Sequence, residues 1–146
     1  MGEAISSLRV IQRMERLATQ VYRTQIRAFR GHEIAERLKI AAENEQEHAD
    51  TLAKLIKELR GNTSKIGIFY QVAGTILGFI TTLLGKVFLL KADLFIERRA
   101  VRDYGNFLQK VDFDEKSVAL INKIVGDEKR HIETLDNSIQ LLKGRR

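Results

Sequence analysis

Apolar residues recur along most of the chain at steps of three and four, which is the period of an α-helix with one buried face. No proline is present to interrupt such helices, so the sequence predicts an all-α fold. Four long helices are expected, over residues 3–30, 32–60 and 86–111, and from just after residue 112 or 114 to about residue 143.

The ends of these helices carry recognisable signals. Gly31 follows the first helix and Gly61 the second, since glycine readily adopts the backbone angles that stop a helix. His32 belongs to the turn between them and is expected to be a cap or a surface residue. Asp114 is the expected N-cap of the last helix, with Ser117 as the other candidate.

Each predicted helix carries a glutamate where its apolar stripe requires a hydrophobic residue. Taken alone, Glu15 could lie at the edge of its stripe with its carboxylate reaching solvent. In the second and last helices, however, the glutamate is followed after three residues by a histidine, which places both side chains on one face. We therefore expect six polar side chains to face the core: Glu15, Glu45, His48, Glu97, Glu128 and His131.

The order of these residues repeats along the chain. A helix with one core glutamate precedes a helix with a core Glu-x-x-His pair, and the arrangement then recurs. The intervals match, since Glu15 and Glu45 are 45 − 15 = 30 residues apart, and Glu97 and Glu128 are 128 − 97 = 31 apart. We expect one domain over residues 1–146, a four-helix bundle in which two hairpins, residues 1–62 and 86–146, bring all four glutamates to one depth.

An apolar crossover over residues 63–85 joins the two hairpins. Its residues 66–85 contain no charged side chain and include four glycines. Three interpretations remain open from the residues alone: a connecting helix buried in the bundle, a segment lying on a membrane surface, and a true membrane span. A span is the least favoured, because it would place the two hairpins on opposite sides of the bilayer.

Composition narrows the classes of protein further. The 146 residues suffice for a real core, and the absence of cysteine excludes disulfides, a thiol nucleophile and cysteine-held zinc or iron–sulfur centres. The net charge of +6 favours solubility or an anionic surface. No nucleic-acid partner is expected, because the basic residues are dispersed and form no recognition motif. The N-terminus lacks the apolar core of a signal peptide, so we expect a cytoplasmic protein, peripheral on the inner face of the membrane if the crossover binds lipid.

Buried carboxylates require positive charge nearby, because an unpaired one costs several kcal/mol or stays protonated. No lysine or arginine lies on the predicted stripes, so two divalent metal ions are the expected partners. Four glutamates and two histidines form the ligand set of carboxylate-bridged di-iron and di-manganese bundles. A bundle without metal, whose core acids share protons, is the alternative.

Four further residues are predicted to support this site. Asp127 and Asn44 each precede a Glu-x-x-His glutamate, and each could accept the free ring N–H of the opposite histidine. A solvated charge is the other interpretation of Asp127. Tyr22 and Tyr104 each follow a lone glutamate by seven residues, where they could hydrogen-bond a ligand or merely pack, and packing is the simpler expectation.

The chain resembles the ferritin-like di-iron carboxylate superfamily, and within it most closely the demethoxyubiquinone hydroxylase family. The resemblance implies that the six core residues bind two irons, with manganese as the alternative metal. It also implies O₂-dependent hydroxylation of a hydrophobic, quinone-like ring, with the Gly-rich segment resting on the bilayer. The points of resemblance are Glu15 with Tyr22, the Glu45–His48 motif, the apolar segment 72–85, Glu97 with Tyr104, and Asp127-Glu128 through His131.

Two departures from the family pattern concern the substrate rather than the metals. The family usually has histidine before the third-helix tyrosine, where this chain has Asp103, and the family's tryptophan in the Gly-rich segment is absent.

Glu15 and Glu97 are the expected catalytic carboxylates, shifting between bridging and terminal positions as the metal charge changes. The alternative function is a rubrerythrin- or ferritin-like iron oxidase or peroxide scavenger without an organic substrate. Whatever the function, residues 66–85 could form a homodimer contact instead of a lipid contact.

Overall fold

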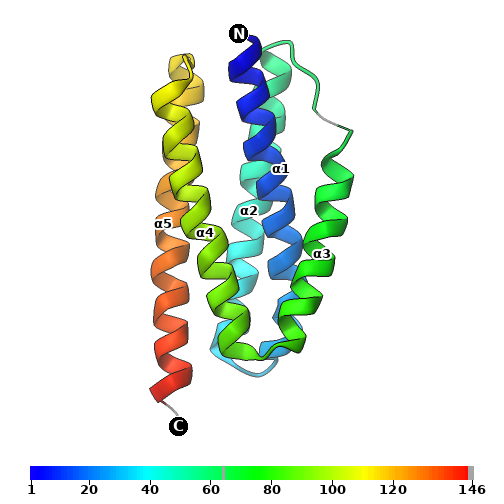
Figure 1. Ribbon diagram of the computed structural model, residues 1–146, viewed down its shortest axis with the longest axis vertical. Helices are drawn as coiled ribbons and strands as arrows, with labels where there is room; N and C mark the ends of the chain where they lie inside the picture. Colours follow the sequence, from blue (N-terminus) through cyan, green and yellow to red (C-terminus); the bar gives the residue numbers. More distant parts are fainter. Residues whose placement is uncertain (64, 145–146) are drawn as a thin grey trace.

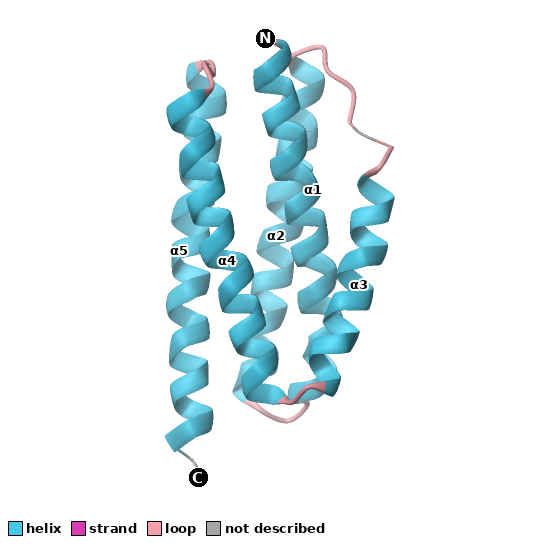
Figure 2. Ribbon diagram, viewed as in Figure 1, coloured by secondary structure: helices cyan, strands magenta, loops and turns pink. Residues whose placement is uncertain are grey.

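The computed structural model describes residues 1–63 and 65–144, and these residues form helices joined by short connections at both ends of the molecule, without strands (Figure 2). The predicted all-α fold is confirmed. In chain order the elements are α1 (Gly2–Gln25), the short 3-10 helix η1 (Ile26–Phe29), α2 (Glu33–Glu58), α3 (Gly67–Leu83), α4 (Lys86–Lys110) and α5 (Glu115–Gly144).

The helix ends follow local chemistry. The first helix does not continue to residue 30 as α-helix, because its last turn tightens into η1, and Gly31 then adopts a φ of 80°. His32 is the N-cap of α2, and its ring accepts a hydrogen bond from the backbone N–H of Ile34 at 3.2 Å. Asp114 caps α5 by accepting from the backbone N–H of Ser117 at 2.7 Å, so Ser117 lies inside the helix and is not the cap.

Four helices form the bundle, and α3 lies outside it (Figure 1). The chain runs along α1 and back along α2, and α4 and α5 form a second antiparallel pair. Contacts of α1 with α4 and of α2 with α5 join the two pairs, while α3 packs against α1.

The apolar core consists of two clusters, one toward each end of the bundle. The first cluster includes Phe29, Leu38 and Leu90, and the second includes Leu8 and Ile121. On each of the four bundle helices, the predicted polar residues come between the residues of one cluster and those of the other. The polar site is therefore enclosed by packed hydrocarbon on both sides along the bundle axis.

Helix α3 approaches α1 through its glycines. A Cβ atom on Gly74 would lie 2.3 Å from the carbonyl oxygen of Leu17, and one on Gly78 would lie 2.8 Å from that of Val21. These distances are shorter than any side chain tolerates, so the close packing of the two helices depends on glycine.

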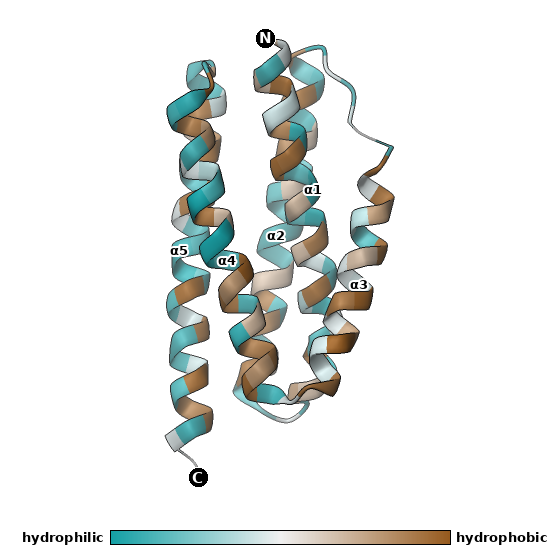
Figure 3. Ribbon diagram, viewed as in Figure 1, coloured by the Kyte–Doolittle hydropathy of each residue, from teal (hydrophilic) through white to brown (hydrophobic). Residues whose placement is uncertain are grey.

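The opposite face of α3 is apolar and exposed. Hydrophobic residues of α3 and of the start of α4 are brown in Figure 3, and exposed apolar side chains occur on both helices. The interpretation of α3 as a connecting helix buried in the bundle is therefore wrong, because mainly its small residues are buried. Among the described residues, no helix combines the length and the apolar character needed to cross a bilayer. We call the exposed set the apolar face: Ile68, Phe69, Val72, Ile76, Phe79, Ile80, Leu83, Leu84, Phe88 and Phe95.

Candidate metal centre

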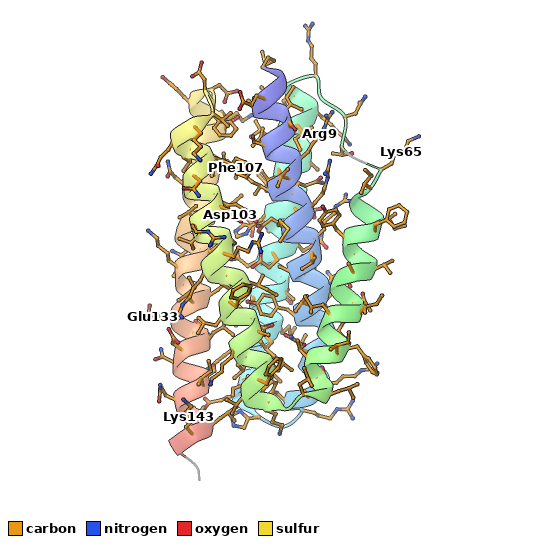
Figure 4. All side chains as sticks on the ribbon, in the orientation of Figure 1. Arg9, Lys65, Asp103, Phe107, Glu133 and Lys143 are labelled. Atoms are coloured by element: carbon orange, nitrogen blue, oxygen red, sulfur yellow. The ribbon has the colours of Figure 1, made fainter. Side chains whose placement is uncertain are left out.

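The structure brings the six predicted core residues together at the middle of the bundle. All four glutamates are at most 2% exposed, so Glu15 does not reach solvent from the edge of its stripe. The off-stripe glutamates Glu43, Glu47 and Glu133 are exposed, and Glu133 is drawn on the outer side of α5 in Figure 4. The position of each glutamate on the helical period therefore distinguishes the buried core glutamates from the exposed ones.

The six residues form two overlapping groups of four. In each group, one ligand atom from every residue lies within 4.8 Å of the corresponding atoms of the others. Glu45 and Glu128 belong to both groups, which is the position of carboxylates that bridge two ions. The first group is Glu15, Glu45, His48 and Glu128, and the second is Glu45, Glu97, Glu128 and His131.

His48 is held at both ring nitrogens. Its Nδ1 lies 2.9 Å from Glu15 Oε2 and 3.3 Å from Glu128 Oε1, so this nitrogen faces the carboxylates. Its Nε2 lies 2.8 Å from Asp127 Oδ2. Asp127 is itself buried and accepts hydrogen bonds from Lys123 and Arg130 on the same helix. Asp127 is thus a buried contact of the histidine rather than a solvated charge, and it orients the ring.

His131 is held on one side only. Its Nδ1 lies 3.0 Å from Glu45 Oε1, 3.0 Å from Glu128 Oε2 and 3.5 Å from Glu97 Oε1. Asn44, predicted to accept from this ring, is half-buried, and within residues 1–63 and 65–144 no hydrogen bond joins it to His131. The structure does not bring this predicted pair together.

The two tyrosines hydrogen-bond across the bundle, so the expectation that they merely pack is wrong. The Tyr22 hydroxyl on α1 donates to Glu97 Oε1 on α4, and the Tyr104 hydroxyl on α4 donates to Glu15 Oε1 on α1. Because α1 and α4 run in opposite directions, equal seven-residue offsets bring each tyrosine to the glutamate of the other helix. That crossing follows from the helix directions, which the sequence repeat alone does not show.

One buried polar group near the site was missed by the sequence reasoning. Gln25 donates to Thr81 Oγ1 at 2.9 Å and to Asp93 Oδ1 at 2.8 Å, and these three buried side chains link α1, α3 and α4. Asp93 precedes Glu97 by four residues and therefore lies on the same face of α4. This four-residue spacing was the signal in the sequence that could have identified Asp93 as a buried polar residue near the site. Burial raises the pKa of the Asp93 carboxyl well above its usual range.

Burial and mutual repulsion favour protonated carboxyl groups in the site. Burial, together with the charges of Glu15 and Glu97, raises the pKa of Glu45 to about 8. Burial and the neighbouring Glu128 likewise raise the pKa of Glu97 to about 8. Burial opposes a charge on His48, but its contacts with Glu128 and other carboxylates outweigh this and raise its pKa to about 11. Without metal, the site therefore holds protons at neutral pH.

The residues fit two divalent cations. Four carboxylates offer eight acceptor oxygens, whereas the imidazole rings and the two tyrosine hydroxyls supply few donors. Accordingly Glu45 Oε2 and Glu128 Oε1 are buried and accept no hydrogen bond from the residues that the structure describes. Leaving such oxygens unpaired is unfavourable, and two cations would satisfy them. Carboxylate with imidazole suits iron or manganese, whereas zinc usually takes fewer ligands.

Two Glu-x-x-His pairs and two further glutamates, set around one point by four helices, define a ferritin-like carboxylate bundle. The chain belongs to the family described as Ubiquinone biosynthesis protein COQ7, which matches residues 3–143. This is the demethoxyubiquinone hydroxylase family of the ferritin-like superfamily, which confirms the resemblance drawn from the motifs. A comparison with curated proteins gave no match. Membership implies a di-iron protein with a hydroxylase-type role in ubiquinone biosynthesis.

Tyr22→Phe is expected to weaken metal binding by roughly 10- to 100-fold, because Glu97 loses the hydroxyl that orients it. Competition with a chelator of known affinity measures the change. Tyr70→Phe is the matched control, since Tyr70 lies on α3, where it packs beneath the Arg13 guanidinium. Equal affinity in Tyr22→Phe and wild-type protein would show that the tyrosine only packs.

Proposed function

We propose that this protein is a di-iron monooxygenase that hydroxylates a hydrophobic, quinone-like ring with O₂ at a membrane surface. The ring carbon exchanges its C–H bond for a C–OH bond, and O₂, two electrons and two protons yield the hydroxyl oxygen and one water. Bound iron would supply the redox chemistry that activates O₂, and an external reductant would supply the electrons. Glu15, Glu45, His48, Glu97, Glu128 and His131 would hold the two ions.

The proposal depends mainly on one observation, an apolar groove of about 360 Å³ between α1, α3 and α4. Its walls include Met14, Leu77 and Phe95, and it extends to the buried Tyr104. Asp103 and Phe107, labelled on α4 in Figure 4, also line it. An apolar pocket with a few polar groups at one end is the usual form of a site for a hydrophobic ring.

Tyr104 connects the groove to the metal centre. It lines the groove and donates its hydroxyl to Glu15, which belongs to the first ligand group. Burial and the charge of Glu15 raise the pKa of the Tyr104 hydroxyl well above its usual range, so this hydroxyl keeps its proton and remains a donor. Tyr104 would thus orient Glu15 while its ring separates the carboxylates from the substrate groove. Glu15 and Glu97 would adjust their metal contacts during the reaction.

The apolar face supports a membrane as the source of the substrate. Leu77 and Phe95 line the groove, and Phe95 also belongs to the apolar face, so the groove lies next to that surface. Lys65 and Lys86 flank α3 at its two ends, where they would attract anionic lipid headgroups. A substrate dissolved in the bilayer would enter the groove without crossing water.

The enzymatic proposal is tested with purified, Fe(II)-loaded protein, a demethoxylated quinone with a short isoprenoid tail, a chemical reductant and ¹⁸O₂. We expect a hydroxylated product that carries one ¹⁸O atom. Ala100→Leu adds volume to the wall of the groove and is expected to lower turnover by roughly 100-fold through misplacement of the ring, while the metal content stays at the wild-type level. Unlabelled product, or oxidation of iron without any change to the quinone, would contradict the proposal.

The double variant Phe69→Ser/Phe79→Ser is expected to abolish flotation with anionic vesicles, because the two rings are 70% and 59% exposed and lie on the apolar face. Ile40→Ser is the control, since Ile40 is exposed on α2 instead. Size-exclusion chromatography of the same variants distinguishes lipid from a second copy. Retained flotation, or a dimer that dissociates only in the double variant, would show that the apolar face does not bind the membrane.

A further inference from the structure

The repeat along the chain suggests two equivalent metal positions, but the structure shows that they differ. His48 is 1% exposed and is fixed from behind by Asp127, which Lys123 and Arg130 hold in turn. The side chain of His131 is 11% exposed, and Asn44, the counterpart of Asp127 in the repeat, lies without a hydrogen bond to it in the described part of the chain.

His131 also lines two neighbouring cavities on the side of the bundle where α2 and α5 meet. The first cavity, of about 390 Å³, extends from His131 and Tyr22 past Ala41. The second, of about 460 Å³, extends from His131 past Asn44 and Thr134. Ile40, His131 and Thr134 line both, so the two cavities adjoin, and we call them together the α2–α5 cavity. Of the six ligand residues, only His131 lines it.

We propose that the α2–α5 cavity is the entrance for metal ions, and that the two positions exchange their ions at different rates. The position formed by Glu45, Glu97, Glu128 and His131 is the exchangeable one. The position that includes Glu15 and His48 retains its ion. This inference rests on the metal centre of the proposed function, but it does not depend on the reaction catalysed there.

The lining of the α2–α5 cavity suits a hydrated cation. Each cavity is large enough to hold several water molecules, since one molecule occupies about 30 Å³ in liquid water. Glu43, Glu47 and Asn44 line the second cavity, and their side-chain oxygens can replace water around an entering ion. The cationic Arg130 in that lining is already paired with Asp127. The apolar groove on the other side extends to Tyr104 rather than to a ligand, and a hydrated ion entering it would lose water to hydrocarbon.

The difference in retention follows from the support behind each histidine. A ring fixed by a carboxylate stays aimed at its ion, and loss of such a partner typically weakens metal binding by roughly 10- to 100-fold. His48 has this support, whereas no carboxylate of the described residues lies behind His131 in the same way. In this proposal His131 turns toward the cavity more readily than His48, which opens the path to the shared carboxylates of Glu45 and Glu128.

The experiment uses Co(II), whose visible absorption reports coordination. Metal-free protein is loaded with two equivalents, and the ions are then removed with excess chelator in a stopped-flow instrument. We expect two phases of equal amplitude whose rates differ by roughly tenfold or more. His131→Ala is expected to leave one tightly held ion and to remove the fast phase, and Asp127→Asn is expected to accelerate the slow phase. A single phase in the wild-type protein would overturn the inference.

A matched pair of variants tests the entrance. Ala41→Leu narrows the α2–α5 cavity and is expected to slow Co(II) uptake at least fivefold without changing the final content of two ions. Ala100→Leu adds the same side chain to the apolar groove and is expected to leave uptake unchanged. Thr134→Leu provides a second obstruction at an exposed position, should Ala41→Leu fold poorly. Uptake that is slowed by Ala100→Leu, and by neither of the other two, would overturn the assignment.

The outcomes separate this inference from the proposed function. Two ions with unequal exchange, in a protein that does not hydroxylate quinones, would support the inference and contradict the function. Hydroxylation of quinones together with equal exchange rates of both ions would support the proposed function and contradict the inference. A protein that binds no divalent metal would overturn both.

Discussion

Replacing Glu128 by alanine should reduce the metal content from two ions per chain to nearly none. Glu128 belongs to both groups of four ligands, so its loss removes a donor from each ion at once, unlike the loss of Glu15 or Glu97. The remaining carboxylates would still be buried, and Glu15 and Glu97 would no longer face the Glu128 charge that raises their pKa values. Elemental analysis after Fe(II) reconstitution measures the content, and hydroxylase activity should vanish with it.

Glu133→Ala is the matched control for this experiment. Glu133 lies on the same helix, five residues further along, and its side chain is exposed. Its replacement should change neither the metal content nor the circular dichroism spectrum. If Glu128→Ala retained a normal content of iron, the assignment of the six ligands would be wrong, whatever its effect on activity.

Replacing Gly74 by alanine should destabilise the protein by about 1–3 kcal/mol, the usual cost of forcing an extra methyl group into a packed contact. The new Cβ atom would lie 2.3 Å from the Leu17 carbonyl oxygen, which is backbone and cannot rotate away. Helix α3 must therefore move off α1, and the apolar face and the groove wall at Leu77 move with it. Urea denaturation measures the stability, and vesicle flotation reports the displaced face.

The control, Gly105→Ala, makes the same chemical change in the interior of α4. Apart from the adjacent residues and the backbone of α4 itself, no heavy atom of the described residues lies within 4 Å of the new methyl group. The substitution should therefore stabilise the protein by about 0.5–1 kcal/mol through helix propensity alone. Opposite signs for the two variants are the expected result. Equal destabilisation by both would mean that close approach of α3 to α1 is not what requires glycine at position 74.

The fold and the inward position of the six core polar residues were predictable because both depend on the position of a residue around a helix, which spacing alone determines. Glu45 and His48 differ from their exposed neighbour Glu47 only in their place on the 3.6-residue period. Matching intervals in the two hairpins then predicted that the acids would meet, as the structure has them.

The remaining features depend on how separate helices face each other, which a repeat along one chain does not contain. Asp127 and Asn44 occupy equivalent positions in the repeat, yet of these two only Asp127 contacts a histidine among the residues that the structure describes. The hydropathy of residues 66–85 identified them as apolar, but it did not show which side of the helix packs against a neighbour. The positions of the glycines determine that side, since the side with the smallest residues can approach a neighbouring helix most closely.

The sharing of Glu45 and Glu128 also has a consequence for how the molecule comes apart. Each ion would be gripped by three residues from one hairpin and a single residue from the other. Neither hairpin could complete a coordination sphere by itself, so the cations would join the α1–α2 pair to the α4–α5 pair. Because metal binding would then stabilise the association of the two helix pairs, loss of metal would weaken the contact between the pairs before either hairpin unfolds.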